Sequence, residues 1–217
     1  MRANDTRKES QKGQDAIRRK VVHAVLAGMA RQAREEKAEI FWGDEMGARS
    51  DHQTETTWGL KGQTPVVKMS GARFGCNMVS MITNNGKLSF MVFSKKFTSE
   101  VFFLFLERMS KHYEGRKIYL IIDRHPVHTS KRIVEWFSKQ QEWLNVYYLP
   151  SYSPELNPDE LLNNTVKGKI SCQDQASNSQ DLQKQVRGCL RSIQRSPAIV
   201  KNFFEGKFVS YAKDGAA

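Results

Sequence analysis

Three acidic residues occur where a fold of alternating strands and helices brings functional groups together. Asp44 lies in an apolar stretch at 38–45, Asp123 directly follows the apolar run 118–122, and Glu160 opens a helical pattern. Clustered carboxylates repel one another unless a cation neutralises them. Oxygen ligands favour Mg²⁺ or Mn²⁺, and two such ions about 4 Å apart can activate water against a phosphodiester. The three acids therefore predict a site for two divalent ions.

Each of these acids also has a structural explanation that involves no chemistry. Asp123 could cap the following turn or helix, and Asp44 could pair with one of the many Lys and Arg residues. For Glu160 the explanation is a helix start, with Asn157 as the N-cap and Pro158 at the first helical position. Glu160 then occupies the position of a capping box, where its side chain accepts the backbone N–H of Asn157. The two interpretations of Glu160 are compatible.

The loop before Glu160 is rich in proline. Pro150, Pro154 and Pro158 lie within nine residues of one another. Proline fixes its own φ angle and favours extended geometry in the residue that precedes it. A stiff loop fixes the point at which the next helix begins, so it would position the carboxylate of Glu160 for a metal ion.

Apolar patterns predict the elements that carry the acids. Strands are predicted at 38–45, 66–69, 75–82, 88–93, 118–122 and 145–149. Helices are predicted at 14–37, 98–113, 130–140, 158–170 and 180–195. Antiparallel strands followed by α/β crossovers indicate an α/β protein with the ribonuclease H-like fold, a five-stranded mixed sheet flanked by helices. In that fold the first and fourth strands are neighbours, which would bring Asp44 and Asp123 together.

Two of these elements allow more detailed predictions. The dipeptide Asn85-Gly86 predicts a tight hairpin between the strands at 75–82 and 88–93, because both residues tolerate positive φ. The helix at 98–113 can be capped by Thr98 and is apolar nearly all round, which predicts that it is buried.

The composition indicates a globular protein with a polyanionic partner. The chain has 217 residues, 39% of them hydrophobic, and a formal charge of +11. A basic excess of this size favours nucleic acid, although a solvated basic surface would also explain it. The three cysteines form no CxxC pair, so neither a disulfide framework nor a zinc site is predicted. Without a signal peptide or a long apolar run, a cytoplasmic location with no membrane contact is expected.

Five segments together resemble a known family. They are WGDE at 42–45, KGQTPVV at 61–67, IIDRHPVHTSK at 121–131, LPSYSPELNPDELLNN at 149–164 and RSPAIVKNFFEGKFVSYA at 195–212. Over about residues 37–212 the chain resembles the mariner-like bacterial insertion-sequence transposases of the DDE superfamily. The resemblance implies a ribonuclease H-like catalytic domain, two Mg²⁺ or Mn²⁺ ions, and cut-and-paste DNA transposition. It assigns Asp44, Asp123 and Glu160 as catalytic, metal-binding residues.

The chain departs from the family at two places. Arg124 stands where the family more often has Asn or Gly after the second aspartate, and it could pair with Asp123 or hold phosphate. His125 and His128 could touch the site or simply pack beside it. Relatives carry paired helix-turn-helix modules that read the ends of the element, but here only 1–37 precede the predicted catalytic domain, at 38–213. These first residues are expected to form a flexible segment and a linker helix.

The resemblance also gives partners and alternatives. DNA is the expected substrate, with Trp58, Lys61 and Lys167 as candidate contacts. A homodimer or a separate helix-turn-helix subunit is the expected protein partner. A location in the bacterial cytoplasm, on the nucleoid when DNA is bound, follows from this function. Two other functions stay open: a domain that binds DNA or a partner without cutting, and a ribonuclease H-like nuclease that acts on RNA–DNA hybrids.

Overall fold

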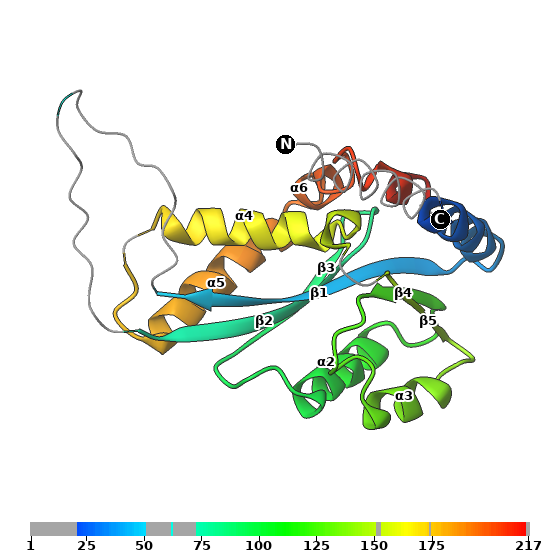
Figure 1. Cartoon of the computed structure of the whole chain (residues 1–217), viewed down its shortest axis with the longest axis horizontal. Coiled ribbons are helices and arrows are strands. Elements are labelled where there is room, and N and C mark those ends of the chain that lie inside the picture. The colour runs from blue at the N-terminus through cyan, green and yellow to red at the C-terminus, as the bar shows by residue number, and fades with distance from the viewer. Residues whose placement is uncertain (1–20, 51–61, 63–72, 151–152, 174, 216–217) are drawn as a thin grey trace, which may run out of the picture.

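Five strands form one mixed sheet, in the order β3-β2-β1-β4-β5 (Figure 1). β1 pairs antiparallel with β2 and β2 with β3, whereas β1, β4 and β5 run parallel. The strands are β1 (Glu39–Arg49), β2 (Gly75–Ile82), β3 (Leu88–Phe93), β4 (Ile118–Ile122) and β5 (Leu144–Tyr148). This arrangement comes from a computed structural model that describes residues 21–50, 62, 73–150, 153–173 and 175–215. The predicted five-stranded mixed sheet is confirmed.

Helices cover both faces of the sheet. α2 (Ser99–His112) and α3 (Lys131–Ser138) pack on one face, below the sheet in Figure 1. α4 (Asp159–Ser171), α5 (Ser179–Gln194), α6 (Pro197–Asn202) and the helical residues 21–35 pack on the other face. Two short 3₁₀ turns, Pro154–Leu156 and Ser210–Gly215, complete the described elements. None of the helices within the described ranges is both long enough and apolar enough to cross a membrane.

The alternation of side chains along β1 produces two separate cores. Ile40 and Trp42 point into the core beneath α4 and α5, whereas Phe41 points into the core beneath α2 and α3. β4 is buried along its whole length, as a central strand that is covered on both faces should be. Because successive residues of a strand face opposite ways, the alternation continues to Asp44 and Glu45, which face different layers.

The β2–β3 hairpin is confirmed, and its turn depends on one glycine. Gly86 has a φ of +92°, and its N–H donates to the carbonyl of Thr83 at 3.0 Å. A Cβ at this position would lie 2.8 Å from the backbone of Pro197, which begins α6. Glycine is therefore required both for the turn and for the close approach of α6.

Several predicted elements need correction. β1 continues past residue 45 to Arg49, because residues 46–49 find pairing partners in the first residues of β2. α2 is not buried all round, since the side chain of Leu104 is 54% exposed on the side away from the sheet. In the helix at 21–35 the apolar residues Val21 and Val25 are also exposed, and Val22, Leu26 and Met29 are the buried ones. α6 was not predicted, and the predicted strand at 66–69 lies outside the described residues.

Candidate active site

The pairing of β1 with β4 places two aspartates at the same edge of the sheet. Trp42 lies opposite Ile121 in this parallel pair, and two residues further along the two strands come Asp44 and Asp123. Ligands of open α/β sheets collect at the carboxyl ends of parallel strands. Both aspartates line a cleft of about 460 Å³, and Glu160 from the first turn of α4 lines the same cleft. The three acids singled out in the sequence therefore lie together.

Buried polar contacts hold the beginning of α4 against the sheet. Asn157 donates from Nδ2 to the carbonyl of Gly43 on β1 at 3.0 Å. Its Oδ1 accepts the backbone N–H of Asp159, the first residue of α4, at 3.1 Å. The hydroxyl of Ser80 on β2 donates to Asp159 Oδ2 at 2.8 Å. These bonds fix the place of the neighbouring Glu160, in addition to any effect of the prolines.

The predicted capping box at Glu160 is wrong. The backbone N–H of Asn157 donates to the carbonyl of Pro154 at 2.9 Å, so it is not offered to the Glu160 side chain. α4 begins at Asp159 with Pro158 at the N-cap position, and Asn157, one residue earlier, accepts the Asp159 N–H through Oδ1. The Glu160 carboxylate therefore lines the cleft without a role in starting the helix.

Asp44 lies among other carboxyl groups. Its Oδ2 accepts Asn163 Nδ2 at 3.0 Å, and its Oδ1 accepts the backbone N–H of Glu45 at 2.9 Å. Burial, followed by repulsion from Asp159, Glu160 and Glu45, raises the pKa of Asp44 to about 9. The carboxyl is therefore largely protonated at neutral pH unless a cation is bound beside it.

Asp159 is a fourth acid behind the cleft and is completely buried. Burial raises its pKa well above the ordinary range, although the bond from Ser80 opposes that effect. Its Oδ1 has no hydrogen-bond partner among the described residues. A neutral carboxylic acid is the form consistent with such a position.

Asp123 has a different environment. Its Oδ1 accepts a 2.8 Å hydrogen bond from His128 Nδ1 and the backbone N–H of His125 at 3.0 Å. Burial opposes ionisation of Asp123, but the His128 bond, the His125 N–H and the charges of both histidines outweigh it and lower the pKa. This carboxylate is ionised at neutral pH and held in one orientation.

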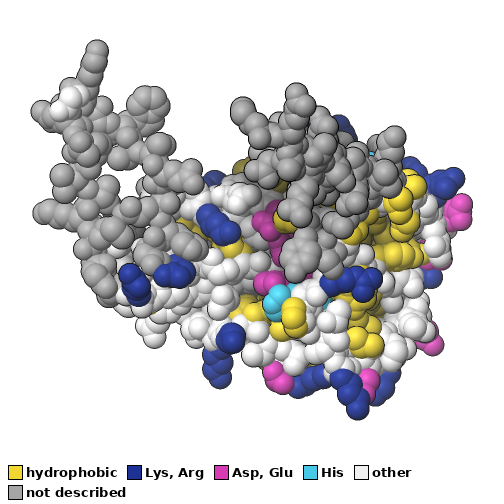
Figure 2. All heavy atoms as spheres, viewed as in Figure 1, with side chains coloured by type: hydrophobic (Ala, Val, Ile, Leu, Met, Phe, Trp, Pro, Cys, Tyr) yellow, Lys and Arg dark blue, Asp and Glu magenta, His cyan; other side chains and the backbone are white. Residues whose placement is uncertain are grey.

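His128 links Asp123 to the opposite face of β1. Its imidazole is 1% exposed and packs on the ring of Phe102, with 4.6 Å between the ring centres. His128 Nε2 lies 3.6 Å from Glu45 Oε2, and His125 Nε2 lies 3.8 Å from Glu45 Oε1. His128 thus packs, as the sequence suggested, and also contacts the site. Figure 2 shows acidic and histidine side chains next to each other between the two helical layers.

Two groups of residues are candidates for holding a metal ion. Asp44, Asp123 and Glu160 line the same cleft, and carboxylate oxygens suit hard divalent cations. Among the described residues, the group whose ligand atoms lie within 4.8 Å of one another is Glu45, Asp123 and His128. In that second group, His128 and Asp123 share a hydrogen bond. The three cleft carboxylates are the candidates that the sequence also indicated.

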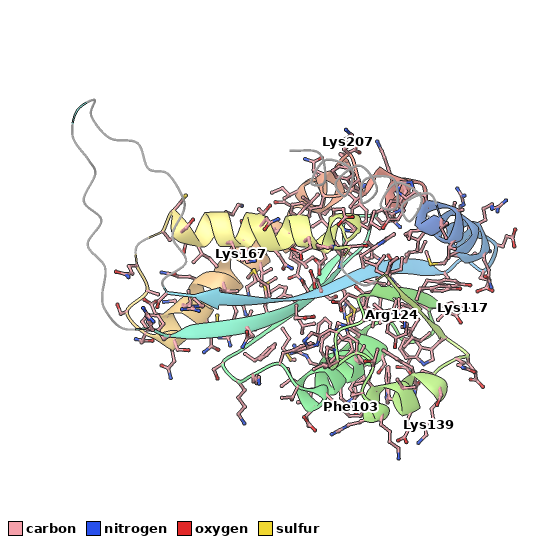
Figure 3. All side chains as sticks on the ribbon, in the orientation of Figure 1. Phe103, Lys117, Arg124, Lys139, Lys167 and Lys207 are labelled. Atoms are coloured by element: carbon pink, nitrogen blue, oxygen red, sulfur yellow. The ribbon has the colours of Figure 1, made fainter. Side chains whose placement is uncertain are left out.

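The candidate DNA contacts receive little support from the geometry. Lys167 is exposed on α4 but does not line the acidic cleft (Figure 3). Trp58 and Lys61 lie outside the described residues.

Sequence reasoning missed the contacts of Asn163 and Asp159 to the sheet. Asn163 comes three residues after Glu160, on the same side of the helix, so its spacing in the sequence could have indicated that it lies near the acids. A completely buried aspartate has no comparable signal, because acids are rarely buried.

Comparison with known proteins gives consistent results. The family described as DDE superfamily endonuclease matches residues 39–183. A relative from Shigella sonnei, the "Insertion element IS630 uncharacterized 39 kDa protein", is 28% identical over 160 residues. That alignment covers 73% of this chain and 46% of the relative, so the chain spans about half the relative's length.

Solved structures of a mariner transposase share the fold. The catalytic domain of Mos1 mariner transposase superposes with a TM-score of 0.55 at 14% identity, covering 91% of this chain and 92% of that one. The Mos1 paired end complex with Mg gives a TM-score of 0.64 at 14% identity, covering 92% of this chain and 60% of that one. The predicted ribonuclease H-like fold and the resemblance to mariner-like transposases are confirmed. Because the family match extends over more than half of its length, the chain belongs to the DDE superfamily endonucleases.

Proposed function

We propose that this chain carries out metal-dependent DNA cleavage and strand transfer in cut-and-paste transposition. The observation that carries the proposal is one cleft lined by Asp44, Asp123 and Glu160, all within the segment that matches the endonuclease family. Similar solved structures support it, namely the Mos1 paired end complexes with Mg and with Mn and the Mos1 Strand Transfer Complex. Residues 38–213 are the proposed catalytic domain, preceded by the linker helix.

The residues of the cleft fit divalent ions. Asp44 is surrounded by Asp159, Glu160 and Glu45, and the repulsion that raises its pKa is the kind that a bound cation removes. Carboxylate oxygens suit Mg²⁺ and Mn²⁺, and the proposed ligands are Asp44, Asp123 and Glu160. When bound, two such ions would activate water and stabilise the leaving oxygen of the phosphodiester.

The protein's own contribution is to orient the ligands. Asn163 and the backbone N–H of Glu45 each occupy one oxygen of Asp44, which limits rotation of that carboxylate. His128 and the backbone N–H of His125 both donate to Oδ1 of Asp123, which limits rotation of that carboxylate as well. Partners that orient metal ligands in this way commonly change activity or metal affinity by about 10–100-fold when removed.

The proposed substrate is DNA, and the formal charge of +11 favours a polyanion. The proposed protein partner is a second copy of the chain or a separate helix-turn-helix subunit. The proposed location is the bacterial cytoplasm, where the chromosome is accessible.

Nicking of supercoiled plasmid tests the proposal. We expect cleavage with Mn²⁺ or Mg²⁺, none with EDTA, and none for Asp44→Asn. Glu135→Gln is the matched control, because it removes an exposed carboxylate of α3 that does not line the cleft. A second readout is the melting temperature, which should rise with added Mn²⁺ in the parent and in Glu135→Gln but not in Asp44→Asn. Ion-independent cleavage, or full cleavage by Asp44→Asn, would contradict the proposal.

A further inference from the structure

Arg124 occupies the wall of the acidic cleft. It directly follows Asp123, and its side chain is exposed. Among the described residues that line the cleft, it is the one arginine or lysine. Figure 3 labels it between the layer of α4 and the layer of α2 and α3. A strand of DNA that enters a cleft lined by three carboxylates meets repulsion, and Arg124 is positioned to offset it.

An aromatic ring holds the guanidinium of Arg124. Its Cζ lies 5.4 Å from the ring centre of Tyr148, the last residue of β5. The Tyr148 ring packs against the core beneath α2 and α3, and its hydroxyl donates to the carbonyl of His128 at 3.3 Å. A guanidinium that rests on a ring face by cation–π attraction keeps the N–H groups at its edge available. Tyr148 thus forms a fixed support for the arginine.

No carboxylate of the described residues forms an ion pair with this guanidinium. Among the ion pairs of the described residues, none involves Arg124. The nearest acid in sequence, Asp123, is already bonded to His128 and to the N–H of His125. Of the two roles that the sequence allowed for Arg124, pairing with Asp123 is therefore not observed.

We propose that Arg124, supported by Tyr148, binds a phosphodiester of the DNA strand that occupies the acidic cleft, beside the bond that is cut. The ligand class is a phosphodiester group, which a planar guanidinium can bind through two parallel N–H···O bonds. Lysine carries the same charge but neither stacks nor binds bidentately, so it is a poor replacement. This inference rests on the proposed function, because it takes DNA as the occupant of the cleft.

The chain offers a matched control on α3. The guanidinium of Arg132 lies over the ring of Phe103, with 4.5 Å from Cζ to the ring centre. Its Nη1 lies 3.7 Å from Glu100 Oε1, and Arg132 does not line the acidic cleft. Replacing either arginine by glutamine removes one positive charge and one contact between an arginine and an aromatic ring. The two arginines differ in their position relative to the cleft and in the ion pair with Glu100, which is observed for Arg132 alone.

The test measures DNA binding without cleavage. Binding of a short fluorescent duplex is followed by anisotropy in an Asp44→Asn background, over salt from about 0.05 to 0.2 M. We expect Arg124→Gln to weaken binding roughly tenfold and to lower the slope of log K against log salt by about 0.9, which corresponds to one phosphate contact. Arg132→Gln should change binding less than about twofold, and Arg124→Lys should lie between the parent and Arg124→Gln.

A double-mutant cycle tests the support by Tyr148. Tyr148→Leu should weaken binding when Arg124 is present and have little further effect in Arg124→Gln, whereas Tyr148→Phe, which keeps the ring, should bind like the parent. Three results would overturn the proposal: an unchanged salt slope in Arg124→Gln, an equal loss in Arg132→Gln, or fully additive effects of Arg124→Gln and Tyr148→Leu. Melting curves identify any variant that fails to fold. If Asp44→Asn still cut DNA, the proposed function would fail, but the binding comparison would remain readable.

Discussion

Asp44 and Asp123 line the same cleft, yet their surroundings push their pKa values in opposite directions. Asp44 is surrounded by three other acids, and burial together with their repulsion raises its pKa to about 9. Asp123 is bonded to the buried His128, and this contact helps to lower its pKa despite burial. Contacts within the protein therefore stabilise the charged form of Asp123, while the charged form of Asp44 is left for a cation to stabilise.

In metal-free protein, the different surroundings of Asp44 and Asp123 should affect the stability of the fold in different ways. A carboxylate with a fixed histidine partner is oriented before any ion arrives, and its partner is lost if the aspartate is changed. A carboxyl crowded by other acids is strained in its charged form, so a neutral substitute relieves that strain. The two aspartates should thus behave alike in cleavage and differently in stability.

Asparagine substitutions provide the largest expected effect. Asp44→Asn and Asp123→Asn should each lower metal-dependent cleavage by at least about 10³-fold, because each removes a charged ligand from the proposed ions. In metal-free buffer at neutral pH, Asp44→Asn should melt at a higher temperature than the parent. Asp123→Asn should melt at a lower temperature, since the charged bond to His128 is lost. Plasmid nicking and thermal melts measure the two effects.

Glu135→Gln is the control for both measurements and should resemble the parent. If Asp44→Asn and Asp123→Asn changed the melting temperature in the same direction, the inferred difference between the surroundings of the two aspartates would be contradicted. Normal cleavage by either one would remove it from the proposed ligand set.

Substitutions of His128 test how the surroundings of Asp123 affect cleavage. His128→Ala should lower cleavage by about 10–100-fold and raise the Mn²⁺ concentration needed for half-maximal rate, because Asp123 loses the group that orients it. His128→Asn can place an amide N–H near the position of Nδ1, so it should recover part of the activity. An alanine variant with a normal Mn²⁺ requirement would show that His128 only packs.

The pH dependence of stability tests the raised pKa of Asp44. In metal-free protein the folded state binds a proton at Asp44 up to about pH 9, whereas the unfolded carboxyl loses it near pH 4. The folded state therefore holds more protons across this window, and its stability falls as pH rises. The melting temperature of Asp44→Asn minus that of the parent should grow between these limits. For Asp123→Asn, whose parent pKa is lowered, the deficit should persist at neutral pH and disappear only in acid.

The sequence predicted local features that depend on short spacing. The strands at 75–82, 88–93 and 118–122 have the predicted bounds, because apolar pattern and the Asn85-Gly86 turn define them. Strand alternation also places Asp44 and Glu45 toward opposite layers. The extension of β1 to Arg49 was not predictable, since residues 46–49 depend on pairing with the beginning of β2.

The difference between the two aspartates was less accessible to sequence reasoning. It depends on contacts between distant segments, such as Asp159 with Ser80 and Asn163 with Asp44. Asp159 also contradicts the rule that acids are exposed. The sequence placed His128 near Asp123, but its spacing could not decide between packing and bonding.

Glu160 gives the smallest expected effect on stability, and it belongs to the crowded end of the site. No capping box is formed, because the N–H of Asn157 donates to Pro154. Glu160→Gln and Glu160→Ala should therefore both fold within about 0.5 kcal/mol of the parent, the usual range for a substitution that removes no cap or buried contact. Both should lose most metal-dependent cleavage, since neither supplies a charged oxygen. Because Glu160 contributes to the raised pKa of Asp44, both variants should also shift the pH dependence of metal-free stability toward lower pH. Chemical denaturation and pH-dependent melts measure these changes. An alanine variant clearly less stable than the glutamine variant would restore the capping role of Glu160. An unshifted pH dependence of stability would show that Glu160 does not contribute to the raised pKa of Asp44.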